Sequence, residues 1–259
     1  MKNINLDIFN IDQLKEIKEG LKQGLDISIY AKNIYSGWQM KEIRLGLKNN
    51  VDVNIYANPK LDFLAMEIIR LGLENNLDAS IYAKEEFNLN QMKEIKNGLE
   101  KNLNVNLYAK PEFNEYQMRE IRHGLENNID VSVYAKNIFN DAQMAEIRDG
   151  LEDNIDVSIY AKPIYDESQM FEIKLGLKEN INVNIYAKRE FDAWQMSQIR
   201  QGLKESIDVE LYAKPELHWE EMEKIRLKNN DLVNNYEKVL ELDKQNLKKE
   251  IKELLKLRY

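Results

Sequence analysis

The chain has no cysteine among its 259 residues, only two histidines and four prolines, and no long hydrophobic run. Without cysteine it cannot form a disulfide, a thiolate metal site or a cysteine nucleophile, which fits a reducing compartment. No apolar segment approaches the roughly 18 residues of a membrane span, and the N-terminus lacks the basic and then apolar layout of a signal peptide. We therefore expect a soluble cytoplasmic protein.

Motifs that carry chemistry are missing as well. The histidines, His123 and His218, lie far apart and have no recurring partner. Asp52-Val53-Asn54 and its repeats share the start of a calcium-binding loop, but the required glycine and distal glutamate are absent. With no phosphate-binding glycine loop and no nucleophile motif, we expect no enzyme activity, no cofactor and no metal site.

Glycine is scarce, with ten residues, yet eight of them recur every 26 residues. A strict period without insertions indicates one local unit that is built many times and stacked on its neighbours. The sequence predicts an all-α fold, an α-solenoid of eight full 26-residue two-helix repeats with a degenerate ninth and a long C-terminal helix. We expect the array to span residues 1–227 and the C-terminal amphipathic helix to span 228–259. The recurring glycines are Gly20, Gly46, Gly72, Gly98, Gly124, Gly150, Gly176 and Gly202.

Each repeat carries the signals of a helix start. A short polar side chain that can cap a helix stands before each predicted first helix, as at Asn114. A glutamine follows three residues later and completes a capping box, except in the third repeat, where Ala65 takes its place. The predicted caps are Asn10, Ser36, Asp62, Asn88, Asn114, Asn140, Asp166 and Asp192.

Helix ends are signalled equally clearly. Each first helix is predicted to end at a residue that enters the left-handed region easily, Gly24 in the first repeat and asparagine later, with Ser206 as the exception. A residue such as Asp156 then caps a second helix of about two turns. Because a glycine inside a helix costs about 1 kcal/mol relative to alanine, the recurring glycines need a reason. We interpret them as points where a neighbouring helix approaches closely, with a backbone-lined ligand groove as the alternative.

A tyrosine also recurs in every repeat. We expect each ring to pack between units and each hydroxyl to find a hydrogen-bond partner. A stacking platform for nucleic-acid bases is the alternative. The tyrosines are Tyr30, Tyr56, Tyr82, Tyr108, Tyr134, Tyr160, Tyr186 and Tyr212.

Charged residues recur in two columns. Glu42 and Arg44 have counterparts in most repeats, and since residues two apart do not face each other on a helix, we predict an ion-pair ladder between successive units rather than catalysis. A column of lysines could follow a phosphate backbone, so an RNA- or DNA-binding array is an alternative function. The formal charge of −8, with −10 on residues 1–227, favours an ordinary solvated edge. The lysines are Lys32, Lys84, Lys110, Lys136, Lys162, Lys188 and Lys214.

Apolar residues occupy a few helix positions that are polar in most repeats. Such residues predict contacts with a partner protein, because aromatic side chains anchor interfaces. Packing against a neighbouring helix or the C-terminal extension is the alternative. The partner-binding candidates are Trp38, Leu45, Leu64, Ile68, Leu71, Tyr116, Phe171, Leu175, Trp194 and Trp219, with Leu227 beside the last.

The C-terminal segment has its own pattern. Val233, Leu240, Leu247 and Leu254 recur every seven residues, with Tyr236, Ile251 and Leu255 nearby. The helix is interpreted either as a terminal cap that covers the last apolar face of the array or as a short coiled coil or partner-binding helix. Asp243 and Lys244 interrupt the apolar seam. An oligomer formed through residues 228–259, and hence a structural or oligomerising role, is a further alternative.

The repeat wording Gln-Met-x-Glu-Ile-Arg-x-Gly-Leu-Glu, followed by Asp-Val-Ser-x-Tyr-Ala, resembles the short two-helix repeat proteins of low-GC bacteria and of their phages and mobile elements. The resemblance covers residues 10–227 and brings no catalytic residues. Phages and mobile elements use small acidic proteins to block host nucleases. The resemblance therefore implies a non-catalytic protein-binding scaffold whose role includes inhibition of a host defence nuclease, as in an anti-CRISPR protein.

Overall fold

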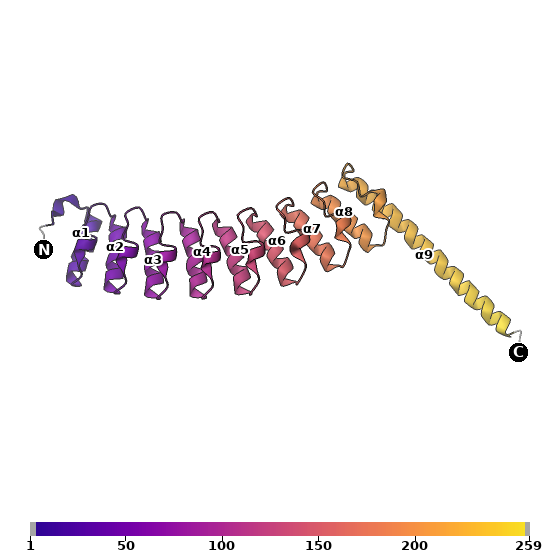
Figure 1. The fold of residues 1–259 in the computed structure, drawn as a ribbon, viewed down its shortest axis with the longest axis horizontal. Helices are drawn as coiled ribbons and strands as arrows, with labels where there is room; N and C mark the ends of the chain where they lie inside the picture. Colours follow the sequence, from indigo (N-terminus) through magenta and orange to yellow (C-terminus); the bar gives the residue numbers. More distant parts are fainter. Residues whose placement is uncertain (1–3, 257–259) are drawn as a thin grey trace. The chain divides into compact units, whose positions relative to one another are not determined.

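The computed structural model describes the backbone of residues 4–256, and their side chains except at positions 232, 233, 235, 250 and 253–256. Throughout this described part every regular element is helical, so the all-α prediction is confirmed (Figure 1). Apart from the last helix, which has 38 residues, helices of 12 residues alternate with three-residue 3-10 turns at intervals of about 26 residues. The α-helices are α1 (Ile11–Lys22), α2 (Gly37–Lys48), α3 (Phe63–Glu74), α4 (Leu89–Glu100), α5 (Glu115–Glu126), α6 (Asp141–Glu152), α7 (Glu167–Lys178), α8 (Ala193–Lys204) and α9 (Trp219–Lys256). The 3-10 turns are η1 (Leu6–Ile8), η2 (Ile27–Ile29), η3 (Val53–Ile55), η4 (Ala79–Ile81), η5 (Val105–Leu107), η6 (Val131–Val133), η7 (Val157–Ile159), η8 (Val183–Ile185) and η9 (Val209–Leu211).

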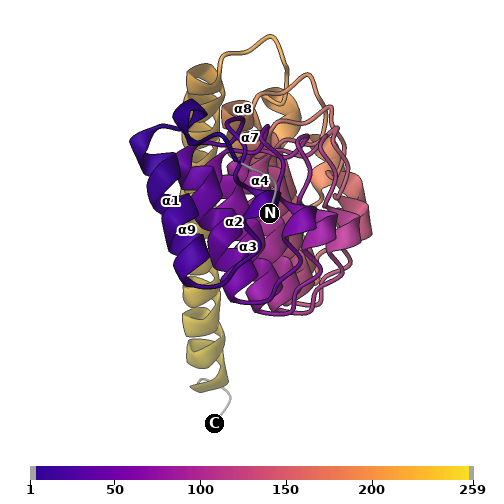
Figure 2. The same cartoon turned by 90° about the vertical axis from the view of Figure 1, so that its left-hand side faces the viewer.

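The chain divides into two compact units, Met1–Met144 and Ala145–Tyr259, with the boundary inside α6. In the first unit each helix from α1 to α4 packs on the next, and in the second unit α7 packs on α8 and α8 on α9. Figures 1 and 2 show α1 to α4 side by side in one row, with the connecting segments at the helix ends. Each unit is therefore a helical array in which neighbours in sequence are neighbours in space.

The predicted capping boxes are present. The Asn114 Oδ1 accepts hydrogen bonds from the backbone N–H groups of Tyr116 and Gln117, and the Gln117 Oε1 accepts one from the Asn114 N–H, all at 2.9 Å. The predicted helix ends are present too, with six asparagines at φ between 56° and 60°, Gly24 at 67° and Ser206 at 59°. Local rules thus account for where each first helix begins and ends.

The capping glutamine also joins one repeat to the next, which the sequence did not predict. The Gln117 Nε2 donates to the Phe139 carbonyl at 2.6 Å, just before the cap of the following helix. The same bond of 2.6–2.7 Å links five other glutamines to the next repeat. In the third repeat Ala65 offers no such donor. These bonds are Gln13 to Tyr35, Gln39 to Leu61, Gln91 to Phe113, Gln169 to Phe191 and Gln195 to Leu217.

The prediction of a two-turn second helix is wrong. Each return segment is a 3-10 turn of three residues. In the first repeat the Asp26 carboxylate caps it by accepting from the Ser28 N–H at 3.0 Å. The turn stops because the Lys32 N–H bonds back to the Tyr30 carbonyl at 2.7 Å, two residues earlier, which diverts the chain from a helical path.

The recurring glycines accommodate a tyrosine hydroxyl of their own repeat, so their interpretation as contacts with a neighbouring helix is wrong. The Tyr30 Oη donates to the Glu16 carbonyl inside α1 at 3.1 Å. A Cβ placed on Gly20 would lie 1.8 Å from the Tyr30 Oη. The corresponding distance from the glycine Cβ to the tyrosine Oη is 1.7–1.9 Å in all eight repeats. The repeating tyrosines are fully buried, and each donates to a helix carbonyl 14 residues earlier, as at Tyr108 and Glu94 at 3.1 Å. The expected hydroxyl partner is therefore found, within the helix.

The predicted ion-pair ladder is confirmed within each unit. In the first unit the Arg44 Nε lies 2.7 Å from a Glu16 carboxylate oxygen, and Arg70–Glu42 and Arg122–Glu94 follow at 2.9 and 2.8 Å. In the second unit Lys174–Glu146 and Arg200–Glu172 repeat the contact at 2.7 and 2.8 Å. Between α3 and α4 the ladder is interrupted, because Ile68 replaces the glutamate and Lys96 pairs with Glu100 of its own helix at 2.5 Å.

The first turns of the long helix α9 form the predicted cap, while the coiled coil or partner-binding helix of its outer segment stays a prediction. These first turns cap the second unit, since Met222 and Arg226 are buried and Arg226 contacts Gln198 and Glu205 at 3.0 and 2.8 Å. From Asp231 to Lys252 every side chain that the structure describes is exposed. The cap therefore ends before the heptad pattern begins. Of the predicted seam, Val233, Leu254 and Leu255 lie outside the residues whose side chains are described.

Replacement of Gly98 by alanine should destabilise the first unit. The new Cβ would lie 1.9 Å from the Tyr108 Oη and 2.8 Å from the Val105 Cγ1. We expect the free energy of unfolding to fall by about 2–3 kcal/mol, because a buried hydrogen bond is lost and the ring is displaced, less the roughly 1 kcal/mol by which alanine favours a helix. Urea unfolding followed by circular dichroism measures the change.

The third repeat provides the matched control. Ala79 replaces valine there, so a Cβ on Gly72 would meet Tyr82 at 1.9 Å (Oη) and 3.3 Å (Cζ) and otherwise only Leu77, at 3.9 Å. Gly72→Ala combined with Tyr82→Phe should therefore recover most of the stability lost in Gly72→Ala. The same double replacement in the fourth repeat keeps the valine clash and should recover less. Equal recovery in the two repeats would contradict the steric explanation.

The buried tyrosines should also make the fold sensitive to alkali. Burial raises the pKa of Tyr30 from 10 to about 12, and burial raises the pKa of six further repeating tyrosines as well. An unfolded tyrosine ionises at its ordinary pKa and the folded one only at higher pH, so this stabilisation is complete below pH 10 and is lost as the pH rises through about 12. We expect tyrosinate absorbance to rise together with unfolding. Ionisation of these tyrosines in a chain that keeps its helical circular dichroism would contradict this link between tyrosine burial and stability.

Candidate protein-binding surfaces

Two groups of exposed apolar side chains lie on the helices, one in each unit. The α2–α3 patch consists of Trp38, Phe63, Leu64 and Leu71, which are exposed, and of Leu45 and Ile68, which are half-buried. Trp38 is 58% exposed, and its ring centroid lies 5.6 Å from that of Phe63 at an interplanar angle of 32°. The four exposed side chains remain at the surface, so packing against a neighbouring helix does not bury them.

The α7–α9 patch repeats the arrangement in the second unit. It consists of Phe171, Trp194 and Leu227, which are exposed, and of Leu175 and Trp219, which are half-buried. Trp194 is 65% exposed, and its ring centroid lies 5.6 Å from that of Trp219 at 31°. Each patch thus contains a tilted aromatic pair at equivalent positions, Trp–Phe in one and Trp–Trp in the other.

The capping glutamines position both pairs. Trp38 is the second residue of α2, and Phe63 is the first residue of α3. The Gln39 side chain, next to Trp38, holds the Leu61 carbonyl at 2.6 Å and so fixes the start of α3 beside it. Sequence reasoning missed Phe63, although its place directly after the cap Asp62 was a usable signal.

The second unit uses the same device. The Gln195 side chain follows Trp194 and donates to the Leu217 carbonyl at 2.7 Å, which fixes the start of α9. Trp219 is the first residue of α9, so it comes to lie against Trp194. His218, the residue that takes the cap position of α9, also has its ring centroid 5.6 Å from that of Trp219. An interior hydrogen bond therefore sets the geometry of a surface feature.

Tyr116 belongs to neither patch. It is exposed on α5, and the Arg119 guanidinium lies 5.4 Å from its ring centroid. Similar cation–π contacts place the Lys41 Nζ 5.3 Å from the Trp38 ring and the Lys174 Nζ 5.7 Å from the Phe171 ring. Cations thus accompany several of the exposed rings, where each contact contributes about 0.5–1 kcal/mol.

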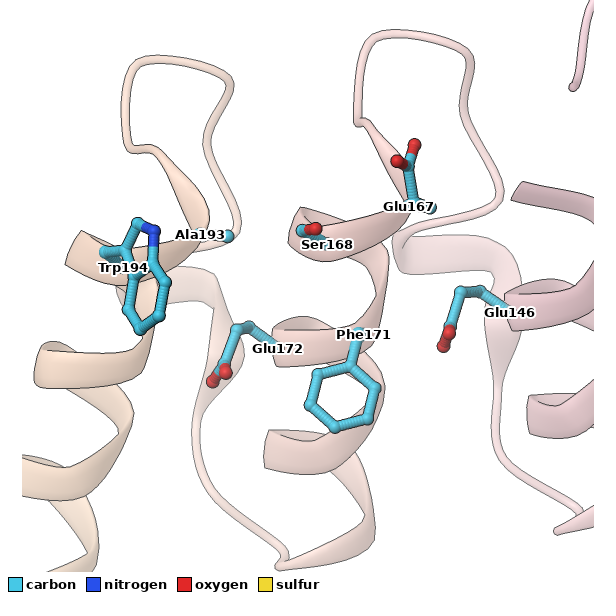
Figure 3. A pocket seen from close by; sticks show the side chains of 7 residues that line it. All are labelled: Glu146, Glu167, Ser168, Phe171, Glu172, Ala193 and Trp194. Carbon is cyan, nitrogen blue, oxygen red and sulfur yellow. The ribbon is translucent and has the colours of Figure 1, made fainter. Parts of the chain in front are cut away.

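A groove of about 320 Å³ opens at the α7–α9 patch between α6, α7 and α8 (Figure 3). Figure 3 shows Glu172 between the rings of Trp194 and Phe171. Glu172 is paired with Arg200 at 2.8 Å, and Glu146 with Lys174 at 2.7 Å, so the ladder forms part of the lining. The lining residues are Glu146, Glu167, Ser168, Phe171, Glu172, Ala193 and Trp194. Aromatic rings with carboxylates between them suit an aliphatic or basic side chain of another molecule.

The lysines of the column are all exposed, which both a solvated edge and a phosphate-binding surface require. Each lysine lies in the connector after a buried tyrosine, and Lys84 and Lys110 place their ammonium groups 5.9 and 5.8 Å from the rings of Phe87 and Phe113. Carboxylates share the connectors, as in Lys84-Glu85-Glu86. Phosphate contacts would therefore be made beside negative charge.

Within residues 4–256, no group of three or more histidine, aspartate or glutamate side chains is arranged to hold a metal ion. Over the same residues, no helix has the length and apolar character needed to cross a membrane. No protein-family model, curated protein or solved structure matches the chain. Any function must therefore be argued from the surfaces themselves.

The α2–α3 patch adjoins the junction that lacks both inter-repeat contacts. Replacement of Ile68 by glutamate should create the missing ion pair with Lys96 and raise the free energy of unfolding by about 0.5–1 kcal/mol. The same change removes an apolar side chain from the patch, so stability and partner binding should move in opposite directions. Chemical unfolding measures the first quantity, and the capture assay described below measures the second.

Ala65→Gln is the matched control at this junction. The new side chain can donate to the Phe87 carbonyl, as its counterparts donate to the next repeat, and it changes no exposed apolar residue. We expect a similar rise in the free energy of unfolding, about 1 kcal/mol, without loss of partner binding. A decrease in stability for both variants would show that the junction is not limited by these contacts.

Proposed function

We propose that the chain is an α-solenoid of eight full repeats and a degenerate ninth that binds another protein and performs no chemistry of its own. The observation that carries this proposal is a tilted aromatic pair at the same position of the repeat in each patch, Trp38–Phe63 and Trp194–Trp219, in which every ring except the half-buried Trp219 is exposed. Tryptophan side chains are prominent among the residues that dominate interface energetics. Contact between the two rings restricts their orientation before binding and lowers the entropy lost on association.

The positions of the patches support recognition rather than folding. The tyrosine, glutamine and arginine of each repeat form the contacts that hold the array together, and these residue types recur in most repeats. Most patch residues stand at positions where several other repeats carry polar side chains, such as Asn90 and Ser168 in place of Trp38. A repeat can therefore fold without an aromatic residue there, and some other property must favour tryptophan.

The charge of the chain indicates the chemistry of the partner. Residues 1–227 carry 39 acidic and 29 basic side chains, and carboxylates line the groove between Phe171 and Trp194. Such a surface attracts basic proteins and repels nucleic acid. We propose a partner whose contact surface presents basic and aliphatic side chains, a description that fits a nucleic-acid-processing enzyme. Inhibition of a host defence nuclease, as by an anti-CRISPR protein, belongs to this class.

Trp38→Ala combined with Leu71→Ala should abolish capture of the partner while leaving the fold intact. Truncation of central interface residues costs about 2 kcal/mol or more each, which corresponds to a loss of affinity of roughly a thousand-fold for the pair. The wild-type chain is used as bait in a lysate of its native host, the captured protein is identified by mass spectrometry, and its affinity is then measured by titration calorimetry.

Ile34→Ala combined with Ile138→Ala is the matched control, because both isoleucines are exposed in connectors outside the patches. This variant should capture the partner as the wild type does. Unfolding of Trp38→Ala/Leu71→Ala would show that the patch is core, and undiminished capture would show that it is not the binding surface. Steeply salt-dependent binding of RNA or DNA, lost on replacement of Lys110 and Lys136 by glutamate, would favour a nucleic-acid-binding array instead.

A further inference from the structure

In the outer part of α9, from Asp231 to Lys252, every side chain that the structure describes is exposed. The first turns of α9 pack on α8, and Figure 1 shows the yellow segment continuing beyond α8 as a single helix. Four apolar residues that the structure describes there, Tyr236, Leu240, Leu247 and Ile251, are exposed. At 100° per residue these four positions fall within about 60° of one another around the helix. They form one stripe, which we call the α9 stripe.

The α9 stripe is symmetric about its centre. Leu240 and Leu247 lie three residues to either side of the pair Asp243–Lys244, and Tyr236 and Ile251 lie seven residues to either side. In the sequence, Val233 and Leu254 continue the same symmetry at ten residues. Read in either direction, the spacing of these stripe positions is therefore the same, and the central pair changes from acidic to basic; the exposed Val239 and Leu242 lie outside the stripe and outside this symmetry.

We propose that the α9 stripe binds the same stripe of a second copy of this chain, with the two helices antiparallel and the two-fold axis between Asp243 and Lys244. In this arrangement Leu240 of each copy faces Leu247 of the other, and Tyr236 faces Ile251. Asp243 of each copy faces Lys244 of the other. The stripe from Tyr236 to Ile251 then gives about 24 Å of paired helix.

The central charges select the antiparallel orientation. A parallel pair in register would place each Asp243 against the same residue of the other copy, and like charges in a seam are destabilising. The antiparallel pair replaces this repulsion by two attractions of opposite charges. Within one chain the Lys244 ammonium lies 3.7 Å from Glu241, but this pair is exposed and contributes little, so the lysine remains able to reach across.

The same charges argue for a second copy rather than an unrelated helix. An apolar groove of another protein would cover Asp243 and Lys244 and leave both without a partner, which is unfavourable when charges are buried. An identical helix supplies the complementary charge and the complementary spacing together. The symmetric pairing is also isologous, the form that closes at two subunits.

The mass of the full chain in solution tests the proposal. Sedimentation equilibrium over a concentration series should show a dimer of twice the 30.6 kDa chain mass that dissociates on dilution. Leu240→Ala combined with Leu247→Ala removes four facing leucines from the dimer and should weaken association roughly a thousand-fold. Leu242→Ala is the matched control, because Leu242 is equally apolar and exposed on the same helix but lies outside the stripe.

Charge exchange tests the central pair. Asp243→Lys places four lysines at the axis of the dimer, and Lys244→Asp places four aspartates there, so each variant should weaken association. The double variant Asp243→Lys/Lys244→Asp restores the pairing and should recover the wild-type dimer. Weakening that persists in the double variant would overturn the assigned axis.

Orientation can be read from oxidation, since the chain has no cysteine of its own. The variants Tyr236→Cys and Ile251→Cys should form no disulfide-linked dimer when each is oxidised alone, and should form one when they are mixed. Cross-linking of each variant with itself would show a parallel pair. A monomer at every concentration, or a dimer weakened as much by Leu242→Ala as by the double leucine variant, would also overturn the proposal.

Discussion

The contact between a tyrosine hydroxyl and a helix carbonyl is the constraint on which each repeat depends. The hydroxyl occupies the space that a Cβ would fill. Each repeat therefore needs three groups together: a glycine, the tyrosine ten residues later and the carbonyl four residues before the glycine, as in Gly98, Tyr108 and Glu94. The buried ring fastens the return segment to its helix and removes about 150–250 Å² of aromatic surface from water. That gain outweighs the helix propensity lost at glycine, about 1 kcal/mol. The return segment can therefore be very short.

Contacts between repeats are a separate system that uses different residues. A glutamine links each cap to the next repeat, and an arginine or lysine binds the glutamate of the previous one, as Gln39 and Arg70 do at the α2–α3 junction. The α3–α4 junction lacks both, because Ala65 and Ile68 stand at these positions. The loss coincides with the α2–α3 patch, and sites at which local rules are broken without an internal gain are often functional. Ile68 therefore affects both the stability of the α3–α4 junction and the composition of the α2–α3 patch.

The repeat, its helix boundaries and the ion-pair ladder could be predicted, because periodicity, caps and charge spacing act through residues close in sequence or one period apart. The reason for the glycines could not be predicted. At Gly20 the space beside the Cα is filled by the Tyr30 hydroxyl, and only the return turn brings that hydroxyl to the helix. The inter-repeat bond of the glutamine could not be predicted for a similar reason. Its acceptor is the backbone carbonyl 22 positions later, which every residue type carries, so the sequence gives no sign of it. The sequence alone did not decide whether the patch residues are exposed, because an apolar residue on a helix suits an interface and a core equally well.

The two aromatic pairs show how the same contacts inside the array can position different side chains on its surface. The glutamine bond brings the second residue of one helix beside the first residue of the next at every junction where it forms, whatever side chains stand there. A single aromatic substitution in each of two neighbouring repeats then creates a preformed pair, with no cost to the contacts inside. The ring centroids of Trp38–Phe63 and of Trp194–Trp219 both lie 5.6 Å apart, and the same glutamine bond is present at both junctions. The geometry of these surface pairs therefore depends on residues inside the array.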